Sequence, residues 1–565
     1  MYKGIAASEG IAIGKILLLK KEEPIINKHT ISAEEVESEK ARLVAAIERS
    51  KRQLEQIKET AGDVMKEILD AHIMILEDVE LSDRINGKIA DKKQDVVSAT
   101  QESIDLFAGI FAAMDDDYMK ERAADIRDIG HHLIMNLLGK EILSLMTLKE
   151  PVIIAAHDIT PSDTAQMNKE KVLGFLTEIG GRTSHSAIMA RTLEIPAILG
   201  LEDITDKLKN GDLVCFDGEE GVLVVDPDEE TLTKYQKKAQ EQEQMKKLLA
   251  EYKDKETRTS DGHRVELAAN IGNPKDAQAA NKNGAEGVGL YRTEFLYMDR
   301  DDLPSEEEQY EAYRSVLEQM GDRPVVIRTL DIGGDKKLPY LPLPEEMNPF
   351  LGYRAVRICL DQTDLFKTQL RALLRASVHG NLKIMYPMIS SLEEVRQANA
   401  ILEECKKELD SKGIAYAKFE VGIMIEIPSA AITADLIAPE VDFFSIGTND
   451  LIQYTCAVDR MNQKISDLYD PFHPAVLRLI RQVIEAAHKS GIWCGMCGET
   501  AGNKRLIPIY LGMGLDEFSM SSGSILKARK QIADLSLSKA QEILADVLKL
   551  GTAQEIEAYM KKVTE

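Results

Sequence analysis

Several features that would place a protein in or across a membrane are missing from this sequence. It has no uninterrupted apolar run long enough to span a bilayer. The first residues, Met1 to Lys15, do not combine a charged segment with a long apolar one, as a secretion signal would. The six cysteines are scattered, and only Cys494 and Cys497 are close in sequence, so we expect no disulfide framework. These absences predict a cytoplasmic protein with no insertion into a membrane.

The chain also has fewer basic residues than acidic ones. The chain has 70 Lys and Arg residues against 95 Asp and Glu residues, which gives a formal net charge of −25. This balance argues against a nucleic-acid partner, because such affinity comes mainly from Lys and Arg on phosphates. It suits a protein partner with a basic face, but it is equally compatible with acidity that only maintains solubility.

A length of 565 residues exceeds what one hydrophobic core supports, so we expect a multidomain chain. After a strand-like start, a helical stretch runs from about Ser32 to Leu145. Ser32 and Glu35 form a candidate capping box. One apolar helix face then recurs at steps of three, four and seven, at Val36, Leu43, Ile47, Leu54 and Ile57. A helical bundle over 21–145 is predicted, with a structural or partner-binding role.

From Pro151 the pattern changes to short apolar runs separated by helical segments, which is typical of an α/β domain. The predicted strands are Val152–Ala155, Leu173–Leu176, Leu213–Phe216 and Val222–Val225. We expect residues 1–20 and 146–228 to form one α/β domain in which the bundle is an insertion. Residues 229–257 are rich in Lys, Glu and Gln and predict an exposed linker helix.

Residues 258–565 carry eight strand candidates, most of them separated by helical stretches. They are Val265–Ala269, Gly287–Tyr291, Val325–Arg328, Leu382–Tyr386, Val421–Ile425, Phe443–Ile446, Ile492–Met496 and Glu517–Met520. This alternation predicts a closed (β/α)8 TIM-type barrel, whose catalytic groups should gather after the strands at the carboxyl-terminal rim. Polar side chains do follow the predicted strands, at Asn270, Arg292, Arg328, Glu426, Asn449, Asp450 and Cys497.

A histidine stands at a predicted helix start in the α/β domain. Gly180 and Gly181 allow a tight turn, and a helix is expected to begin near Ser184. Backbone N–H groups and the helix dipole would favour an anion at His185, such as a phosphorylated imidazole. A capping loop with an ordinary hydrogen-bonded histidine has the same local pattern, so these residues alone leave both interpretations open.

The longer strings around these positions resemble a known family. The segment from Gly180 to Arg191 (GGRTSHSAIMAR) is similar to the phosphohistidine motif of enzyme I of the phosphoenolpyruvate-dependent sugar phosphotransferase system. Three barrel strings match the same family: GLYRTEFL from Gly289, DIGGDK from Asp331 and SIGTNDL from Ser445. The resemblance covers essentially the whole chain. It implies autophosphorylation of His185 by phosphoenolpyruvate, release of pyruvate, and transfer to the histidine of a small phosphocarrier protein (HPr) at the first step of sugar uptake.

The barrel residues suit that substrate, which carries a carboxylate and a phosphate. Arg292, Arg328 and Arg460 can clamp oxygens bidentately, and Asn449 can hold a phosphate oxygen without adding charge. The family pattern adds Lys336 and Arg354 to the substrate-binding set. Glu426 and Asp450 are the candidate ligands for Mg²⁺, which prefers one or two carboxylates plus substrate oxygens.

Two further roles come from the resemblance. Cys497 is implied to protonate the enolpyruvate carbon as pyruvate forms, and Thr164 to hydrogen-bond and orient His185. A Cys-x-x-Cys pair could also indicate a redox or zinc site. Side chains alternate along a strand, however, so Cys494 and Cys497 are expected on opposite faces.

The resemblance also implies partners. The bundle would bind the phosphocarrier, with candidate surfaces at Glu77, Asp78, Glu80 and Asp83 and at Asp115 to Asp117, although a merely solvated charged face would look the same. A homodimer through the barrel and a bacterial cytoplasmic location are implied as well.

Pyruvate phosphate dikinase and phosphoenolpyruvate synthase need a preceding ATP-binding domain, and the nitrogen-related paralogue needs a sensor domain. We expect neither here. A non-catalytic scaffold is disfavoured by His185, Glu426, Asp450 and Cys497.

Overall fold

The computed structural model describes the 565-residue chain except for residues 20–28, 61–62, 113–116, 141–147, 149, 160–162, 164–166, 168–170, 182–183, 299, 335, 337, 463 and 565. The chain divides into two compact units, Met1–Met245 and Lys246–Glu565. Within the described ranges, no helix is both long enough and apolar enough to cross a bilayer.

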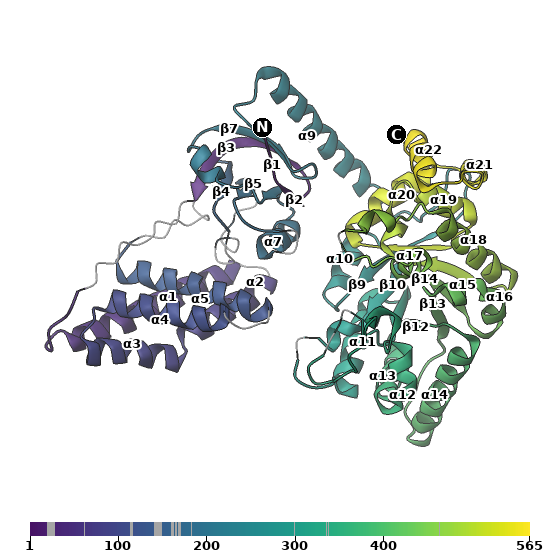
Figure 1. Ribbon diagram of the computed structural model, residues 1–565, viewed down its shortest axis with the longest axis horizontal. Coiled ribbons are helices and arrows are strands. Elements are labelled where there is room, and N and C mark those ends of the chain that lie inside the picture. The colour runs from purple at the N-terminus through teal and green to yellow at the C-terminus, as the bar shows by residue number, and fades with distance from the viewer. Residues whose placement is uncertain are drawn as a thin grey trace. The chain divides into compact units, whose positions relative to one another are not determined.

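The first unit contains an eight-stranded sheet (Figure 1) in the order β1-β8-β7-β3-β4-β5-β6-β2. Its strands are β1 Tyr2–Lys3, β2 Ile5–Ser8, β3 Ile11–Leu19, β4 Val152–Ala156, β5 Val172–Thr177, β6 Ala197–Leu199, β7 Leu213–Asp217 and β8 Val222–Val225. β3 runs parallel to β4, with Leu17 opposite Ile154. The predicted pairing of the first residues with strands beyond Pro151 is therefore confirmed. β6 was not predicted, because three residues are too few to show a period.

Both faces of this sheet are covered, since side chains alternate along each strand. Ile153 lies in one buried cluster, which includes Ile204 of α8 (Ile204–Lys207). Ile154 lies in the other, which includes Ala187 of α7 (His185–Leu193). The helix that begins with His185 is thus packed on the sheet by its apolar face.

Five helices form the bundle between β3 and β4. They are α1 Val36–Thr60, α2 Asp63–Leu76, α3 Val79–Lys92, α4 Val96–Ala112 and α5 Asp117–Leu137. The predicted apolar face of α1 is buried, with Leu43 and Leu54 fully inaccessible. The Glu35 carboxylate accepts a hydrogen bond of 2.7 Å from the Ser32 backbone N–H, which is one of the two bonds of a capping box.

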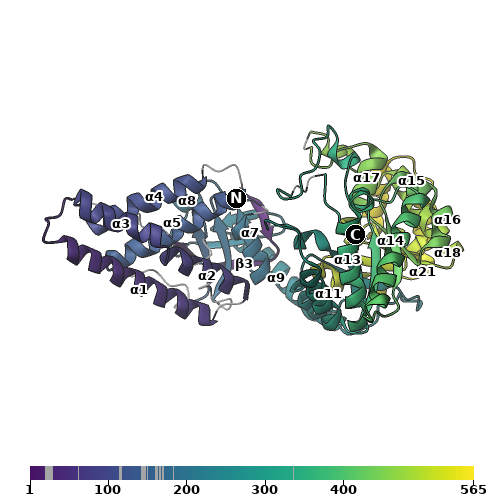
Figure 2. The same cartoon turned by 90° about the horizontal axis from the view of Figure 1, so that it is seen from below.

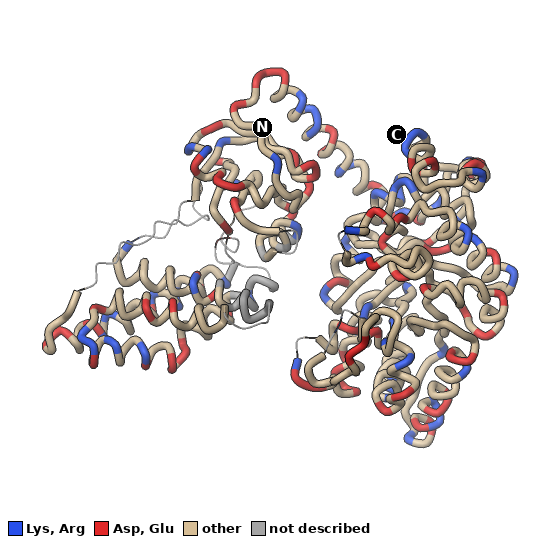
Figure 3. The backbone as a smooth tube through the Cα atoms, in the orientation of Figure 1, with Lys and Arg blue, Asp and Glu red and all other residues tan. Residues whose placement is uncertain are grey.

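The predicted linker helix is present as α9, Glu229–Ala250. Small groups of Glu and Lys residues alternate along it (Figure 3), as expected for a solvated helix. Lys238 fastens it to the sheet of the first unit, because its ammonium group lies 2.9 Å from carboxylate oxygens of both Asp217 and Glu220.

The second unit is a closed barrel of eight parallel strands (Figures 1 and 2), and the predicted strands are confirmed. They are β9 Glu266–Ile271, β10 Gly287–Arg292, β11 Pro324–Arg328, β12 Asn381–Tyr386, β13 Glu420–Ile425, β14 Phe443–Ile446, β15 Trp493–Met496 and β16 Glu517–Met520.

Helices surround the barrel and bury its outer face. The α-helices are α10 Asp276–Lys282, α11 Glu306–Met320, α12 Val356–Asp361, α13 Thr363–Ala376, α14 Leu392–Ser411, α15 Pro428–Ile432, α16 Ala434–Ile437, α17 Thr448–Cys456, α18 Pro474–Lys489, α19 Ile507–Met513, α20 Ile525–Asp534, α21 Leu537–Val547 and α22 Ala553–Thr564. Short 3₁₀ segments are η2 Thr293–Leu296, η3 Pro349–Leu351, η4 Ser377–His379, η5 Ala438–Glu440, η6 Ser466–Leu468, η7 Glu499–Gly502 and η8 Ser522–Ser524.

Two apolar layers result from the strand alternation. The large outer cluster lies between strands and helices and includes Cys494. A small inner cluster fills the middle of the barrel, with Leu290, Val326, Met385, Met424, Phe443 and Cys497 as members. The two cysteines are therefore on opposite faces, as predicted, and both are free thiols.

The barrel interior depends on Gly289 of β10. A Cβ atom there would lie 1.9 Å from Glu517 Oε1 and 2.5 Å from Ser519 Cβ. We predict that Gly289→Ala lowers the free energy of unfolding of the barrel by about 1–3 kcal/mol, because the buried interior would be overpacked. The single tryptophan, Trp493, packs against the inner cluster, so its fluorescence in urea follows this unit.

Gly523→Ala is the matched control, since no atom lies within 4 Å of the added Cβ. Equal stabilities of the two variants would contradict the close packing inferred at Gly289.

Candidate active site

Charged side chains meet at the carboxyl-terminal rim of the barrel. β10 and β11 end with Arg292 and Arg328, while Glu426 directly follows β13. Asp450 lies in the first turn of α17, after β14. Because all eight strands are parallel, their ends share one rim, and residues far apart in sequence come together there.

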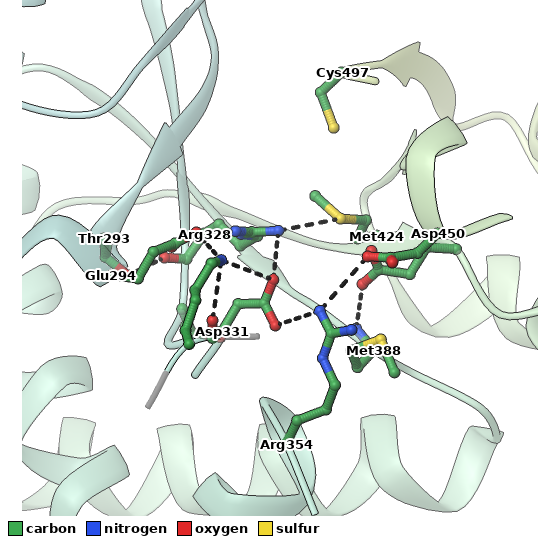
Figure 4. A network of polar contacts seen from close by, with 12 residues as sticks. Thr293, Glu294, Arg328, Asp331, Arg354, Met388, Met424, Asp450 and Cys497 are labelled. Atoms are coloured by element: carbon green, nitrogen blue, oxygen red, sulfur yellow. Dashed lines mark hydrogen bonds and ion pairs between the residues drawn. The ribbon is translucent and has the colours of Figure 1, made fainter. Parts of the chain in front are cut away.

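Arg328 is held from two sides by buried carboxylates (Figure 4). Its Nη2 lies 2.5 Å from Glu294 Oε1, and its Nη1 lies 2.9 Å from Asp331 Oδ2. Nη1 also contacts the Met424 sulfur at 3.7 Å. The Arg328 side chain is only 7% exposed, so these contacts leave it little rotational freedom.

Asp331 joins Arg328 to a second buried guanidinium group, that of Arg354. Arg354 Nη2 lies 2.9 Å from Asp331 Oδ1 and 3.5 Å from Asp450 Oδ2. Gly333, with a φ of 105°, permits this approach, since an added Cβ would lie 2.5 Å from Arg354 Cβ. The neighbouring cations hold the pKa of Asp331 well below its usual range despite burial.

Lys336 completes the cationic side of the network. Its ammonium group lies 2.7 Å from Glu294 Oε1 and 3.3 Å from the Asp331 carbonyl oxygen. The Lys336 side chain is 25% exposed, in contrast to the two arginines. It therefore lies at the solvent-facing edge of the cluster.

Glu426 and Asp450 form the anionic side. Glu426 Oε1 accepts a 2.6 Å hydrogen bond from the Met388 backbone N–H, and Met388 has a strained φ of 56°. Burial, with Asp450 nearby, raises the pKa of Glu426 to about 8. Asp450 Oδ1 is buried without a hydrogen-bond partner among the described residues. Two close carboxylates, one with an orphaned oxygen, fit a divalent cation.

These two carboxylates are too few to enclose a metal ion alone. In the described part of the chain, no group of three or more His, Cys, Asp or Glu side chains is arranged to hold one. This matches Mg²⁺, which takes one or two protein carboxylates and fills its other positions with water and substrate oxygens.

The remaining predicted substrate-binding residues lie at the edge of this network. Arg460 Nη1 is 4.0 Å from Asp450 Oδ1. The side-chain oxygen of Asn449 accepts a 3.1 Å hydrogen bond from the Glu499 backbone N–H. Arg292 is partly buried, and its side chain has no ion-pair or hydrogen-bond partner among the residues described. Its guanidinium group is available for a ligand.

Cys497 lies in the inner apolar cluster, beside the charged network (Figure 4). Its sulfur is 3.9 Å from the Ile446 carbonyl oxygen. The side-chain amide of Asn270 donates a 3.0 Å hydrogen bond to the backbone carbonyl oxygen of Cys497. Burial raises the pKa of the Cys497 thiol to about 12. The thiol therefore keeps its proton at neutral pH.

His185 belongs to the other unit, where it is the first residue of α7. Ser184 caps the helix, with its hydroxyl oxygen accepting a 3.4 Å hydrogen bond from the Ala187 N–H. Ser186 donates a 2.8 Å bond to Asp158 Oδ1. The predicted position at a helix N-terminus is confirmed. Thr164, the predicted orienting residue, lies outside the described residues.

The acidic residues of the bundle have mixed surroundings. Asp78 caps α3 by accepting a hydrogen bond from the Leu81 N–H, and Glu77 lies 2.7 Å from the Lys51 ammonium group. Glu80 and Asp83 are exposed. Of the second candidate surface, residues 115–116 and the Asp117 side chain lie outside what the structure describes.

Sequence reasoning assigned no role to Glu294 or Asp331, although both stand inside the strings that resemble the family. Their position in those strings was the available signal. Their partners, Arg328, Lys336 and Arg354, were predicted as ligands of a substrate, but the carboxylates that hold them were not.

Comparison with known proteins agrees with this architecture. The family described as PEP-utilising enzyme, PEP-binding domain, matches residues 246–537. The mobile and N-terminal domains of PEP-utilising enzymes match residues 148–221 and 3–122.

Two relatives that match this chain over almost its whole length have the same name. A phosphoenolpyruvate-protein phosphotransferase of Priestia megaterium is 54% identical over 564 residues, covering 99% of this chain and 98% of that protein. One of Bacillus subtilis (strain 168) is 53% identical over 565 residues, covering 99% of each. A solution structure of an Enzyme I protein matches 43% of this chain and all of that chain, with 46% identity and a TM-score of 0.40.

The position of Asp331 between two buried guanidinium groups leads to a stability prediction. Asp331→Asn removes the carboxylate that both Arg328 and Arg354 contact. We expect the free energy of unfolding of the barrel to fall by about 3 kcal/mol, because buried positive charge is left undercompensated. Trp493 fluorescence during urea unfolding measures this change.

Asp302→Asn is the control, because Asp302 pairs with Arg300 at 2.8 Å but is 79% exposed. Loss of such a surface pair costs about 1 kcal/mol or less. If both substitutions lowered stability equally, Asp331 would have no special role in the network.

Proposed function

Since the chain belongs to the family of PEP-utilising enzymes, we propose that it transfers the phosphoryl group of phosphoenolpyruvate to its own His185 and then to a histidine of a small phosphocarrier protein. The full-length relatives, which are named for this phosphotransfer, support the activity. The observation that carries the assignment of the site is the cluster of Arg328, Lys336 and Arg354 facing Glu426 and Asp450 at one rim.

Phosphoenolpyruvate brings a carboxylate and a phosphate, so it needs several positive charges in a fixed arrangement. Arg328 and Arg354 are immobilised by Asp331 before any substrate arrives. Groups that are already oriented need no reorganisation as charge develops on the transferring phosphoryl group. Arg292, Arg460 and Asn449 lie at the edge and complete the cradle from the solvent side.

A magnesium ion would be held by Glu426 and Asp450. When bound, it would neutralise charge on phosphate oxygens and lower the repulsion that opposes attack. The orphaned Asp450 oxygen supports this site, because a buried acceptor without a partner is costly unless a cation or donor satisfies it.

In the transfer itself, an imidazole nitrogen of His185 forms a bond to phosphorus as the bond from phosphorus to the enol oxygen breaks. The enolate of pyruvate leaves and takes a proton at carbon from the Cys497 thiol, which solvent later reprotonates. A thiol whose pKa is raised to about 12 by burial holds that proton at neutral pH until a strong base such as the enolate forms. Thr164 orients the imidazole.

Delivery to the carrier uses other parts of the chain. The bundle over 21–145 binds the phosphocarrier. It exposes the acidic Glu80 and Asp83 and also the apolar Met74 and Val79, a combination that suits a basic partner with some apolar surface. The α/β domain, residues 1–20 and 146–228, carries His185 between carrier and barrel, with the linker 229–257 as hinge. The barrel domain, residues 258–565, also forms a homodimer, and the protein works in the bacterial cytoplasm.

Labelling tests the acceptor. Incubated with phosphoenolpyruvate and Mg²⁺, the protein should gain the mass of one phosphoryl group, and His185→Ala should gain none, because the proposed acceptor imidazole is removed. Intact mass measured without acid, which cleaves phosphohistidine, gives the result.

His157→Ala is the matched control, since His157 belongs to the same domain and is 71% exposed. It should label normally. Persistent labelling of His185→Ala would refute the proposed acceptor.

The two neighbouring cysteines test the proton donor. We expect Cys497→Ala to lower net pyruvate formation at least about 100-fold, because the enolate would lack its acid. Cys494→Ala should stay close to wild type, because Cys494 faces the outer cluster. Pyruvate is measured by coupling to lactate dehydrogenase, and an equal loss in both variants would overturn the assignment.

A further inference from the structure

A cavity lies at the amino-terminal end of the barrel, opposite the substrate rim. It has a volume of about 150 Å³ and is lined by residues near the strand starts, among them Glu266, Val288, Pro324, Lys383, Trp493 and Glu517. Because parallel strands start at one end and finish at the other, this amino-terminal cavity is separate from the substrate rim. The inner apolar cluster, which includes Val326 and Met424, lies between them.

Glu517 is the unusual residue of this cavity. It is only 4% exposed, and neither carboxylate oxygen has a hydrogen-bond partner in the part of the chain that the structure describes. Its carboxylate rests on two glycines, since added Cβ atoms at Gly289 and Gly495 would lie 1.9 and 2.0 Å from its oxygens. Glycines in two strands, β10 and β15, thus leave the space for this carboxylate, which has no hydrogen-bond partner among the described residues.

The nearest positive charge does not satisfy Glu517. Lys383 Nζ lies 2.6 Å from Glu420 Oε2 and 4.5 Å from the centre of the Trp493 ring. Trp493 Nε1 donates to the same Glu420 oxygen at 2.9 Å. The donors of Lys383 and Trp493 are therefore directed to Glu420, whereas both oxygens of Glu517 are without a donor among the described residues.

Electrostatics point the same way. Burial raises the pKa of Glu517 well above its ordinary value, and the nearby carboxylates of Glu266 and Asp516 add to this, against Lys383. Burial also raises the pKa of Glu266 to about 7. Without a bound cation, Glu517 therefore holds its proton at neutral pH. A positively charged group that fits the cavity would stabilise the ionised carboxylate as this proton is released, and would give its oxygens the partners that they lack.

We propose that the amino-terminal cavity is a binding site for a small primary ammonium compound, whose –NH₃⁺ group is held by Glu517 and Glu266. The aliphatic walls formed by Val288, Val326 and Pro324 would cover its short alkyl part. A water molecule takes up about 30 Å³ in the liquid, so the volume admits a molecule of a few heavy atoms. A metal ion fits less well, because it would leave the aliphatic walls of the cavity without an apolar group to contact.

Calorimetric titration of the full-length protein with ethylammonium chloride tests this site. Tetramethylammonium chloride keeps the ionic strength constant and serves as a cation without N–H donors. We expect saturable binding of one ethylammonium per chain, with a dissociation constant that rises at least tenfold in Glu517→Gln, which preserves the shape of the side chain but cannot ionise. Glu542→Gln, at an exposed residue that pairs with Lys539, should bind like wild type.

Three outcomes would overturn the proposal. They are the absence of saturable binding, equal binding by wild type and Glu517→Gln, and tighter Glu517-dependent binding of K⁺ or Na⁺, which would assign the cavity to a metal ion. If Glu517→Gln does not fold, as judged by circular dichroism, Glu266→Gln is the second variant and should also weaken binding. The titration contains no phosphoenolpyruvate, so its result is independent of labelling at His185.

Discussion

The substrate rim depends on one carboxylate, that of Asp331, lying between two buried guanidinium groups. Burying arginine without a partner is strongly unfavourable, and Asp331 is the one carboxylate that contacts both Arg328 and Arg354 among the described residues. Glu294 contacts both Arg328 and Lys336, so negative and positive groups continue to alternate through the network. The result is a rigid array in which the positive groups are fixed close to Glu426 and Asp450, with Arg354 Nη2 3.5 Å from Asp450 Oδ2.

This array determines what the site can bind. A ligand with two anionic groups gains from several cations that are already oriented, and the side chains lose little further entropy when it arrives. The two remaining carboxylates leave room for a cation between protein and ligand. The same burial keeps the Cys497 thiol protonated, because the inner apolar cluster surrounds it. The charged rim thus suits the binding of an anionic ligand, while the apolar packing beneath it keeps Cys497 as a proton donor.

The barrel interior has three levels along its axis. Charged groups occupy the carboxyl-terminal rim, apolar side chains fill the middle, and the amino-terminal cavity again contains carboxylates. The rim carboxylates are largely compensated by arginine and lysine, whereas Glu517 is not. The proposed acceptor, His185, belongs to the other compact unit, so the proposed reaction requires an approach of reacting atoms to about 3–3.5 Å between units. A helix with a solvated, alternating charge pattern, α9, connects them.

Local patterns in the sequence were sufficient for much of this protein. Eight apolar runs predicted the eight barrel strands, because each run is buried on both faces and bounded by polar residues. Strand alternation placed Cys494 and Cys497 on opposite faces, and glycines followed by Ser184 predicted the helix that starts at His185. Strand β6 was missed because three residues show no period. Only the tertiary structure decided that Asp331 pairs with both arginines, that Glu294 holds Arg328 and Lys336, and that Glu517 lies buried without a partner. Some of these contacts join residues far apart in sequence, such as Glu294 and Arg328, 34 positions apart, and Gly289 and Glu517, 228 positions apart. No local period in the sequence records which distant charges a closed barrel brings together.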